Sequence, residues 1–285
     1  MTPLVTAAVL LAAVTHASWN AIAAHIRDQL LSFTLISGGG ALIGAVTACF
    51  VPLPAAGAWP YLIASAALHI AYYALLMRSF SLGDFGQMYP IARGTAPLVV
   101  TLLAAVFVSE VPDTVQLAGV AVASAGLTGL ALWGIRGKGA RPHWPALLAA
   151  GATGLSIAAY TVVDGVGVRA SGSPLGYVAW LMLAQGLIIP LYALARRRPA
   201  AALATELRPY AGRGLLAAAL SVTAYALVLW AQTRAPLAPI AALRESSIIV
   251  GAAIGALFFK ERFGAPRVAA ASLMVLGIGL MLYAS

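Results

Sequence analysis

Charged residues are scarce in this chain of 285 residues. Asp, Glu, Lys and Arg together make up 9% of the sequence, whereas a typical soluble domain contains roughly 25%. Hydrophobic residues make up 62%, and the mean hydropathy is +0.94. Because so little polar surface is available to cover a water-soluble globule, the composition excludes an ordinary soluble domain and predicts a membrane protein.

Cysteine and the signatures of several enzyme classes are missing as well. Cys49 is the only cysteine, which excludes an intrachain disulfide framework. The sequence contains no His-Glu-x-x-His motif, no Gly-x-Ser-x-Gly motif and no phosphate-binding loop for ATP hydrolysis. The four histidines are scattered without metal-ligand spacing. We therefore expect no catalytic residues, no metal site and no cofactor.

Long apolar runs fill nearly the whole chain. A membrane-spanning helix needs about 20 mostly apolar residues. Breaks at charges, proline and glycine give ten such runs, and the connections between them leave no room for a soluble domain. Runs this long also exclude a β-barrel, whose strands alternate over about ten residues. The sequence predicts an all-α polytopic membrane protein with ten transmembrane helices, near residues 3–24, 30–51, 59–80, 85–109, 113–134, 144–166, 174–195, 212–232, 238–259 and 264–284.

Positive charges are distributed unevenly over the predicted loops. Twelve lysines and arginines lie in loops that follow odd-numbered helices, whereas the other loops and the termini hold only Arg169 and Arg234. Cytoplasmic loops carry the excess of Lys and Arg. We therefore predict a multi-pass protein of a bacterial-type inner membrane with both termini outside. Basic loops beside anionic lipid head groups account for the net charge of +9 without a nucleic-acid partner.

The two halves of the sequence resemble each other weakly. A shift of 151 positions places Arg93 on Arg244 and Glu110 on Glu261. Because each half contains five predicted helices, an odd number, the second half would enter the membrane from the opposite side. Such inverted repeats are typical of alternating-access transporters, whose site lies near the midplane. Chance similarity between Ala- and Leu-rich helices is the alternative. The predicted repeats are residues 1–135 and 136–285, within one membrane domain.

Three charged residues lie inside the predicted spans and away from their ends: Arg93, Arg244 and Glu245. A charge at the bilayer centre costs about 2.5–3.5 kcal/mol on insertion scales, so these side chains should face the protein interior. They are expected either to form an ion pair between the two halves or to place an arginine beside a substrate carboxylate. Ser246 is expected either to bind the substrate or to hydrogen-bond within its own helix.

Aromatic and polar side chains recur near the middle of the predicted spans. His69, Tyr72 and Tyr73 share one face of a helix, as do His16, Trp19 and Asn20. Trp and Tyr usually gather at membrane interfaces, so at mid-span they either pack in the core or line a pocket for a small molecule. The residues that we predict to bind substrate are Trp19, Asn20, His69, Tyr72, Tyr73, Tyr89, Arg93, Tyr160, Trp180, Tyr225, Arg244, Glu245 and Ser246.

Two helical segments and the turns that follow them carry a resemblance to a known family. The segments are YPIARGTAP at 89–97 and APIAALRE at 238–245, and the turns are SEVP at 109–112 and KERFG at 260–264. With ten helices in two repeats, the whole chain resembles the EamA-like branch of the drug/metabolite transporter superfamily, and within it the amino-acid exporters of the YddG type. That family is usually drawn with cytoplasmic termini, whereas the charge pattern here predicts the opposite.

These features predict an inner-membrane transporter that exports small metabolites by alternating access, with aromatic or large neutral amino acids as substrates. The alternatives are a drug, cation or metabolite carrier of the same superfamily, and, in a different class, an intramembrane enzyme or scaffold. Glu245, His69 and His16 are candidates for proton coupling, although a uniporter or exchanger fits equally well. We expect a monomer rather than an obligate oligomer. The aspartates Asp28, Asp84, Asp113 and Asp164 are expected at or near helix ends.

Overall fold

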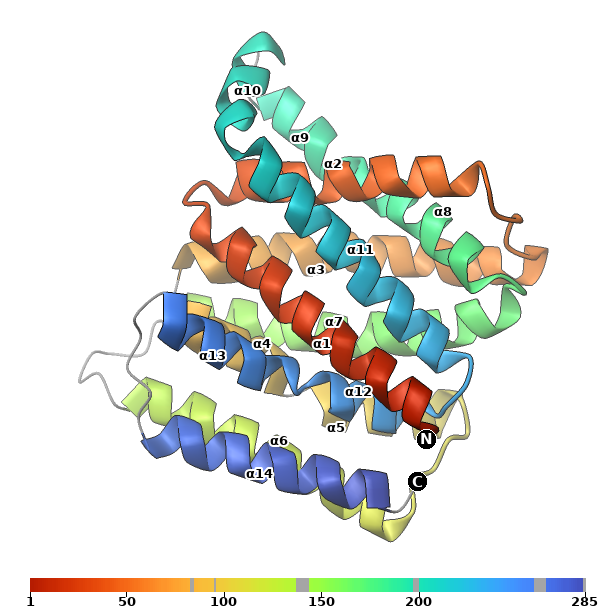
Figure 1. Ribbon diagram of the computed structural model, residues 1–285, viewed down its shortest axis with the longest axis vertical. Coiled ribbons are helices and arrows are strands. Elements are labelled where there is room, and N and C mark those ends of the chain that lie inside the picture. The colour runs from red at the N-terminus through yellow and green to blue at the C-terminus, as the bar shows by residue number, and fades with distance from the viewer. Residues whose placement is uncertain (83–84, 95, 137–143, 197–199, 259–264, 284–285) are drawn as a thin grey trace.

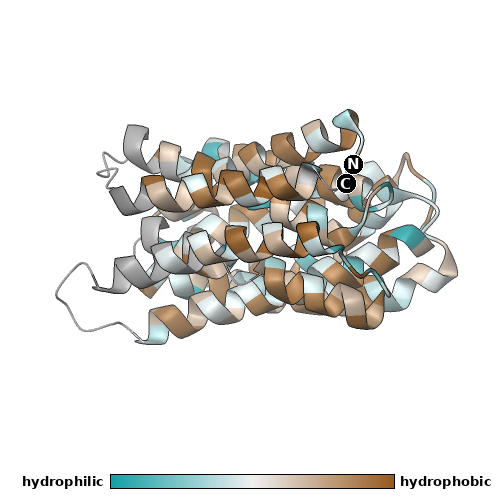
Figure 2. Cartoon of the chain, turned by 90° about the horizontal axis from the view of Figure 1, so that it is seen from below, coloured by the Kyte–Doolittle hydropathy of each residue, from teal (hydrophilic) through white to brown (hydrophobic). Residues whose placement is uncertain are grey.

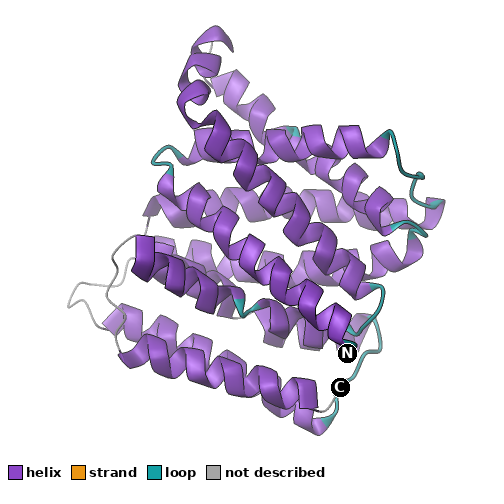
Figure 3. Ribbon diagram, viewed as in Figure 1, coloured by secondary structure: helices purple, strands orange, loops and turns teal. Residues whose placement is uncertain are grey.

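The computed structural model describes residues 1–82, 85–94, 96–136, 144–196, 200–258 and 265–283, and all regular structure within them is helical (Figures 1 and 3). The helices are α1 Pro3–His25, α2 Gln29–Ala48, η1 Ala56–Ala58, α3 Trp59–Leu82, α4 Phe85–Gly94, α5 Ala96–Phe107, α6 Thr114–Arg136, α7 Trp144–Ala170, α8 Pro174–Gly186, α9 Ile188–Arg196, α10 Ala200–Leu207, η2 Arg208–Tyr210, α11 Ala211–Gln232, α12 Leu237–Arg244, α13 Ser247–Phe258 and α14 Ala265–Tyr283.

Capping side chains fix where the first two helices begin. The Thr2 hydroxyl accepts a hydrogen bond from the Val5 backbone N–H, and Pro3 occupies the start of α1, where a missing N–H costs nothing. The Asp28 carboxylate accepts from the Leu31 backbone N–H in the same way at α2. A cap of this kind stabilises a helix by about 1 kcal/mol. The short turn between α1 and α2 therefore follows from local chemistry, and Asp28 lies at a helix end as predicted.

Six described helical segments are long and apolar enough to cross a membrane, judged by length and composition. Large hydrophobic side chains are also exposed on the outside of the helices, for example Leu42, Leu102 and Leu148. Figure 2 shows hydrophobic residues along the lengths of the helices. The all-helical membrane class is therefore confirmed. The six segments are Pro3–His25, Gln29–Ala48, Ala56–Leu82, Trp144–Ala170, Pro174–Arg196 and Ala201–Gln232; shorter apolar segments are Ile91–Phe107, Thr114–Gly126 and Val268–Met281.

Two of the predicted spans are each divided into two helices within the described residues. The first, near 174–195, is divided at Leu187 into α8 and α9, and the second, near 238–259, into α12 and α13. Between α12 and α13 the chain turns at Glu245 and Ser246, where backbone N–H groups bond to carbonyls three residues back. Pro239 lies in the first turn of α12, so it does not cause this second interruption.

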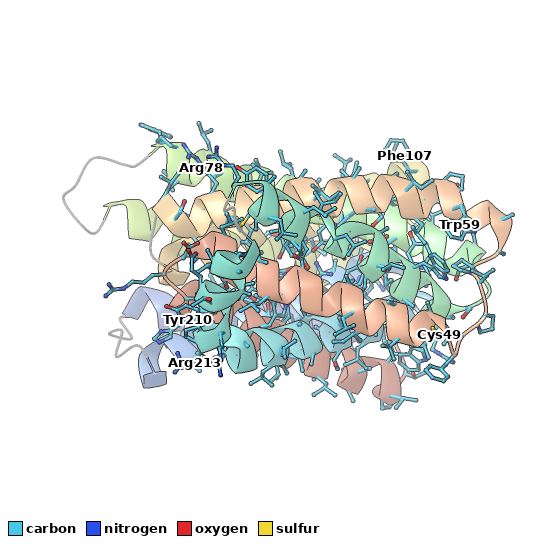
Figure 4. All side chains as sticks on the ribbon, turned by 90° about the horizontal axis from the view of Figure 1, so that it is seen from above. Cys49, Trp59, Arg78, Phe107, Tyr210 and Arg213 are labelled. Atoms are coloured by element: carbon cyan, nitrogen blue, oxygen red, sulfur yellow. The ribbon has the colours of Figure 1, made fainter. Side chains whose placement is uncertain are left out.

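The two ends of the helical bundle differ in charge. The N- and C-termini lie close together at the right-hand end in Figure 1. Figure 4 places Arg78 and Arg213 at the opposite end, and Cys49, Trp59 and Phe107 at the end of the termini. Two of the arginines counted in the basic loops, Arg78 and Arg213, therefore lie together at the end opposite the termini. Asp84 and Glu261 lie outside the described residues.

Glycines allow α6 and α14 to pack with their backbones in contact. A Cβ atom added to Gly119 would lie 2.6 Å from the Gly277 carbonyl oxygen, and one added to Gly277 would lie 2.5 Å from the Gly119 carbonyl oxygen. Gly126 faces Ala270 in the same manner, at 2.9 Å from its carbonyl oxygen. Small residues spaced four or seven apart permit this approach in membranes, where dispersion contacts and hydrogen bonds hold helices together.

We expect Gly277→Leu to force α6 and α14 apart and to lower the free energy of unfolding by about 1–3 kcal/mol, the usual cost of overpacking. Gly279→Leu is the matched control, because a Cβ atom at Gly279 meets nothing within 4 Å. Thermal unfolding of the two variants in detergent compares them directly. Equal unfolding temperatures would contradict the proposed contact.

Candidate functional site

An internal cavity lies where α1, α3, α7, α8, α11 and α12 meet. Its unoccupied space amounts to about 420 Å³, including the part open to solvent. This space is narrow, so a molecule inside it would find room for about one water only. The cavity is therefore contracted in this conformation. Its lining consists of Ala12, His16, Trp19, His69, Tyr72, Tyr73, Tyr160, Met182, Gln185, Ser221, Ala224, Tyr225, Val228 and Arg244.

A cluster of rings from α3, α7 and α11 forms one wall of the cavity. His69 stacks on Tyr160 with 4.0 Å between ring centroids, and Tyr225 meets the His69 ring edge-on at 5.1 Å. Tyr72 contacts Tyr160 at 5.5 Å and Tyr73 at 5.2 Å between centroids. Offset and edge-to-face contacts of this kind add about 0.5–1.5 kcal/mol each beyond area burial. The predicted face of α3 is thus turned toward the cavity.

His69 is held in one tautomer by its own helix. Its Nδ1 atom lies 3.0 Å from the backbone carbonyl oxygen of Ser65 and 3.1 Å from the Ser65 hydroxyl. A carbonyl can only accept a hydrogen bond, so Nδ1 carries the proton and Nε2 is left as an acceptor. The Ser65 hydroxyl, which accepts from Nδ1, keeps its own proton to donate elsewhere.

Arg93 and Glu245 form a buried ion pair between the two halves of the chain. The Arg93 Nε and Nη2 atoms donate to the two Glu245 carboxylate oxygens at 2.8 and 2.7 Å, and both side chains are 1% exposed. Arg93 Nη1 also contacts His16 Nε2 at 2.9 Å. The expected pairing of Glu245 with an arginine is thus present.

Arg244, the other intramembrane arginine, has a different environment. Its side chain is 3% exposed, borders the cavity and interacts with Tyr160, while its Nε atom has no hydrogen-bond partner. No described acidic side chain forms an ion pair with it, since both oxygens of Glu245 are used by Arg93. A buried guanidinium that lacks an anionic partner creates a site for an anion.

Asp164 was expected near a helix end, and this prediction is wrong. Helix α7 continues to Ala170, so Asp164 lies six residues inside it and its side chain is fully buried. Its carboxylate accepts hydrogen bonds from the Tyr177 hydroxyl, at 2.9 Å, and from the Tyr225 hydroxyl. Ser65 interacts with it as well. The error arose because hydropathy placed the end of this span at residue 166, four residues too early.

Seven of the thirteen predicted binding residues border the cavity, and their role in binding stays a prediction. Of the others, Tyr89 donates to the Ser247 hydroxyl at 3.1 Å, Asn20 donates to the His16 carbonyl at 2.9 Å, and Trp180 packs against Trp59. The predicted residues that do not border the cavity are Asn20, Tyr89, Arg93, Trp180, Glu245 and Ser246.

Three polar lining residues, His16, Gln185 and Ser221, were not among the predicted binding residues. Gln185 and Ser221 each lie on the same helix face as another lining residue: Gln185 is three residues after Met182, and Ser221 is four residues before Tyr225. That helical spacing is the signal that could have found them. Ser221 also interacts with Tyr73 across the cavity.

Comparison with known proteins gives a family and a fold. Residues 144–283 match the model of the EamA-like transporter family. Among solved structures, 29 chains match; one of them, described only as "Crystal structure of protein", has a TM-score of 0.69 and 17% sequence identity. The match covers 99% of this chain and 96% of that one, and at this identity it shows the fold alone. No curated protein matches the sequence.

Proposed function

We propose that this chain, whose residues 144–283 match the EamA-like transporter family, moves small metabolites that combine a carboxylate with an aromatic or large apolar group across a bacterial inner membrane. Aromatic and large neutral amino acids are the compounds that we expect it to export. The observation that carries the proposal is Arg244: a buried guanidinium without an anionic partner borders a cavity walled by rings.

The carboxylate of the substrate would bind beside Arg244. Arg244 Nε has no partner in the protein, and a charge-assisted hydrogen bond to a carboxylate is about twice as strong as a neutral one. Arg93 is less suitable, because Glu245 already occupies two of its nitrogen atoms. The two arginines that the sequence places at equivalent positions therefore have separate tasks: Arg93 joins the halves of the chain, and Arg244 receives the substrate.

Two further features of the lining suit a zwitterion with a ring. The side-chain oxygen of Gln185 is buried without a hydrogen-bond partner, so it could accept from the substrate's ammonium group. Tyr72, Tyr73 and Trp19 supply ring faces and edges against which an aromatic side chain would stack. Polar atoms that remain unpaired inside a protein are those that a ligand can satisfy, which supports Gln185 as part of the site.

Helix contacts support two inverted five-helix repeats, residues 1–135 and 136–285. In such a repeat α1 corresponds to α7, and α3 to α11. The contact of α1 with α11 is then the counterpart of the contact of α7 with α3, and both are observed. The contacts of α2 with α8 and of α6 with α14 each join corresponding helices of the two repeats.

A polar network closes the end of the bundle where the termini lie, which supports alternating access. The Glu110 carboxylate accepts from Arg169 and from the Leu237 backbone N–H, both at 2.6 Å. Arg169 also donates to the backbone carbonyls of Gln232 and Ala235, at 2.7 and 3.0 Å. These bonds tie the turn after α5 to the end of α7 and to the turn before α12. We infer that they open when this end opens, and that this end faces outward, because the basic loops lie at the other.

Transport by purified protein in liposomes tests the proposal. We expect saturable uptake of labelled phenylalanine and leucine, weak uptake of glycine, which lacks a side chain for the ring wall, and none of a quaternary ammonium compound. Liposomes without protein are the control. Uptake of the quaternary ammonium compound in place of the amino acids would assign the chain to cation or drug transport, and uptake of none of the compounds would contradict the proposed substrate class.

A further inference from the structure

Asp164 has an environment unlike that of the other buried carboxylate, Glu245. Three neutral hydroxyl groups surround it, those of Ser65, Tyr177 and Tyr225, and no described lysine or arginine forms an ion pair with it. Glu245 is held by two hydrogen bonds from Arg93, so a proton there would leave a buried guanidinium without its anion. Asp164 can gain or lose a proton without leaving a paired guanidinium group bare of its anion.

The titratable and charged groups that face Asp164 come from several helices. Tyr177 reaches it from α8 and Tyr225 from α11, and His69 of α3 contacts it through Ser65. Tyr160 of its own helix and Arg244 of α12 lie within electrostatic range. Helix α4 also packs against α7, but its Arg93 is paired with Glu245, and α5 and η1 contain no titratable residue.

Tyr225 connects this carboxylate to the cavity. Its hydroxyl donates to Asp164, and the same side chain lines the cavity together with Arg244, whereas Asp164 itself does not. We propose, on the basis of the carrier function above, that Asp164 is a proton-binding site that couples transport to the proton gradient through Tyr225. While Asp164 is ionised, the single hydroxyl proton of Tyr225 is used by the aspartate. Once Asp164 is protonated, its own O–H can donate to the Tyr225 oxygen, and the tyrosine proton becomes available to the substrate.

The sign of the coupling follows from the same geometry. A substrate carboxylate next to Arg244 accepts hydrogen bonds, so it gains a donor when Tyr225 is released. Protonation of Asp164 also removes a negative charge that would repel the substrate carboxylate. The same negative charge would otherwise weaken the attraction of Arg244 for the substrate. The proton and the carboxylate therefore favour each other's binding and cross the membrane in the same direction. Export proceeds only while the outward substrate gradient exceeds the inward proton gradient.

Two measurements on liposomes separate coupling from transport itself. Exchange of labelled for unlabelled phenylalanine at equal pH reports the carrier, and accumulation driven by an acidic exterior, with the membrane potential clamped at zero, reports the coupling. We expect the wild type to accumulate substrate about tenfold per pH unit of gradient, the limit for one proton per substrate. Asp164→Asn should keep exchange within about threefold of wild type, because the asparagine oxygen can accept from Tyr177 while its NH2 group donates to the Tyr225 oxygen, as the protonated aspartate would. The same variant should lose accumulation completely. Asp164→Glu, which keeps a carboxyl group, should retain part of the accumulation driven by the pH gradient.

Glu206→Gln, which removes a carboxylate from the exposed helix α10, is the matched control and should accumulate substrate like the wild type. Direct proton uptake provides a readout that does not depend on transport: substrate added to unbuffered detergent-solubilised wild type should raise the pH, and the same addition to Asp164→Asn should not. Accumulation by Asp164→Asn, or accumulation driven by an acidic interior in the wild type, would overturn the coupling proposal. Absence of exchange in the wild type would instead contradict the carrier function.

Discussion

Replacing Arg244 with glutamine is expected to reduce the transport of carboxylate substrates about 100-fold, which corresponds to about 2.7 kcal/mol. Glutamine keeps a hydrogen-bond donor near the position of the arginine Nε atom but removes the charge that a buried carboxylate requires as its partner. Because Arg244 has no ion pair within the described protein, its removal leaves no other charge unpaired, and the helix should fold normally. Initial rates of labelled phenylalanine uptake into liposomes measure the effect.

Two controls distinguish a binding role from a general loss of charge or stability. Arg213→Gln removes an exposed arginine from α11 and should leave the rate unchanged. Phenylalaninamide, which lacks the carboxylate, should compete poorly with phenylalanine in the wild type, and Arg244→Gln should compress that difference to less than about threefold, because only the carboxylate interaction is lost. If Arg244→Gln still preferred phenylalanine over its amide by the wild-type factor, Arg244 would not be the carboxylate partner.

The sequence alone predicted that Arg93, Arg244 and Glu245 lie inside the protein, but it could not predict how they pair. Arg244 and Glu245 are neighbours in the chain, and adjacent residues of a helix point about 100° apart, so they face different partners. Glu245 binds Arg93, 152 positions away, whereas Arg244 faces the cavity. A partner this distant can be found only when the packing of α4 against α13 and of α1 against α12 is known.

Asp164 illustrates a second limit of sequence reasoning. Hydropathy locates the middle of a span well and its end poorly, so an acidic residue near residue 166 is naturally placed in the head-group region. Its partners, Tyr177 and Tyr225, are 13 and 61 residues away on other helices. The periodicity of α3, in contrast, correctly predicted one shared face for His69, Tyr72 and Tyr73, because a helical repeat needs no tertiary information.

The ion pair between Arg93 and Glu245 should be the most destabilising single contact to break. Glu245→Gln leaves a buried guanidinium, and Arg93→Met leaves a buried carboxylate, so either variant should lose about 3–5 kcal/mol of unfolding free energy. We expect Glu245→Gln to keep downhill flux of substrate in liposomes, measured at a temperature where the variant is still folded.

The double variant Arg93→Met/Glu245→Gln should recover at least about 2 kcal/mol relative to the sum of the single changes, because neither charge remains unpaired. Glu206→Gln on exposed α10 provides the single-charge control and should change stability by less than about 0.5 kcal/mol. Unfolding in detergent is monitored by the loss of the helical circular dichroism signal for the two single variants, the double variant and the control. Comparison with the wild type gives the double-mutant cycle. Additive losses would mean that the two side chains do not stabilise each other. A double variant that unfolds near the wild type but no longer exchanges substrate would assign the pair a part in the conformational change, since the same two residues join the two halves of the chain where α4 meets the turn after α12.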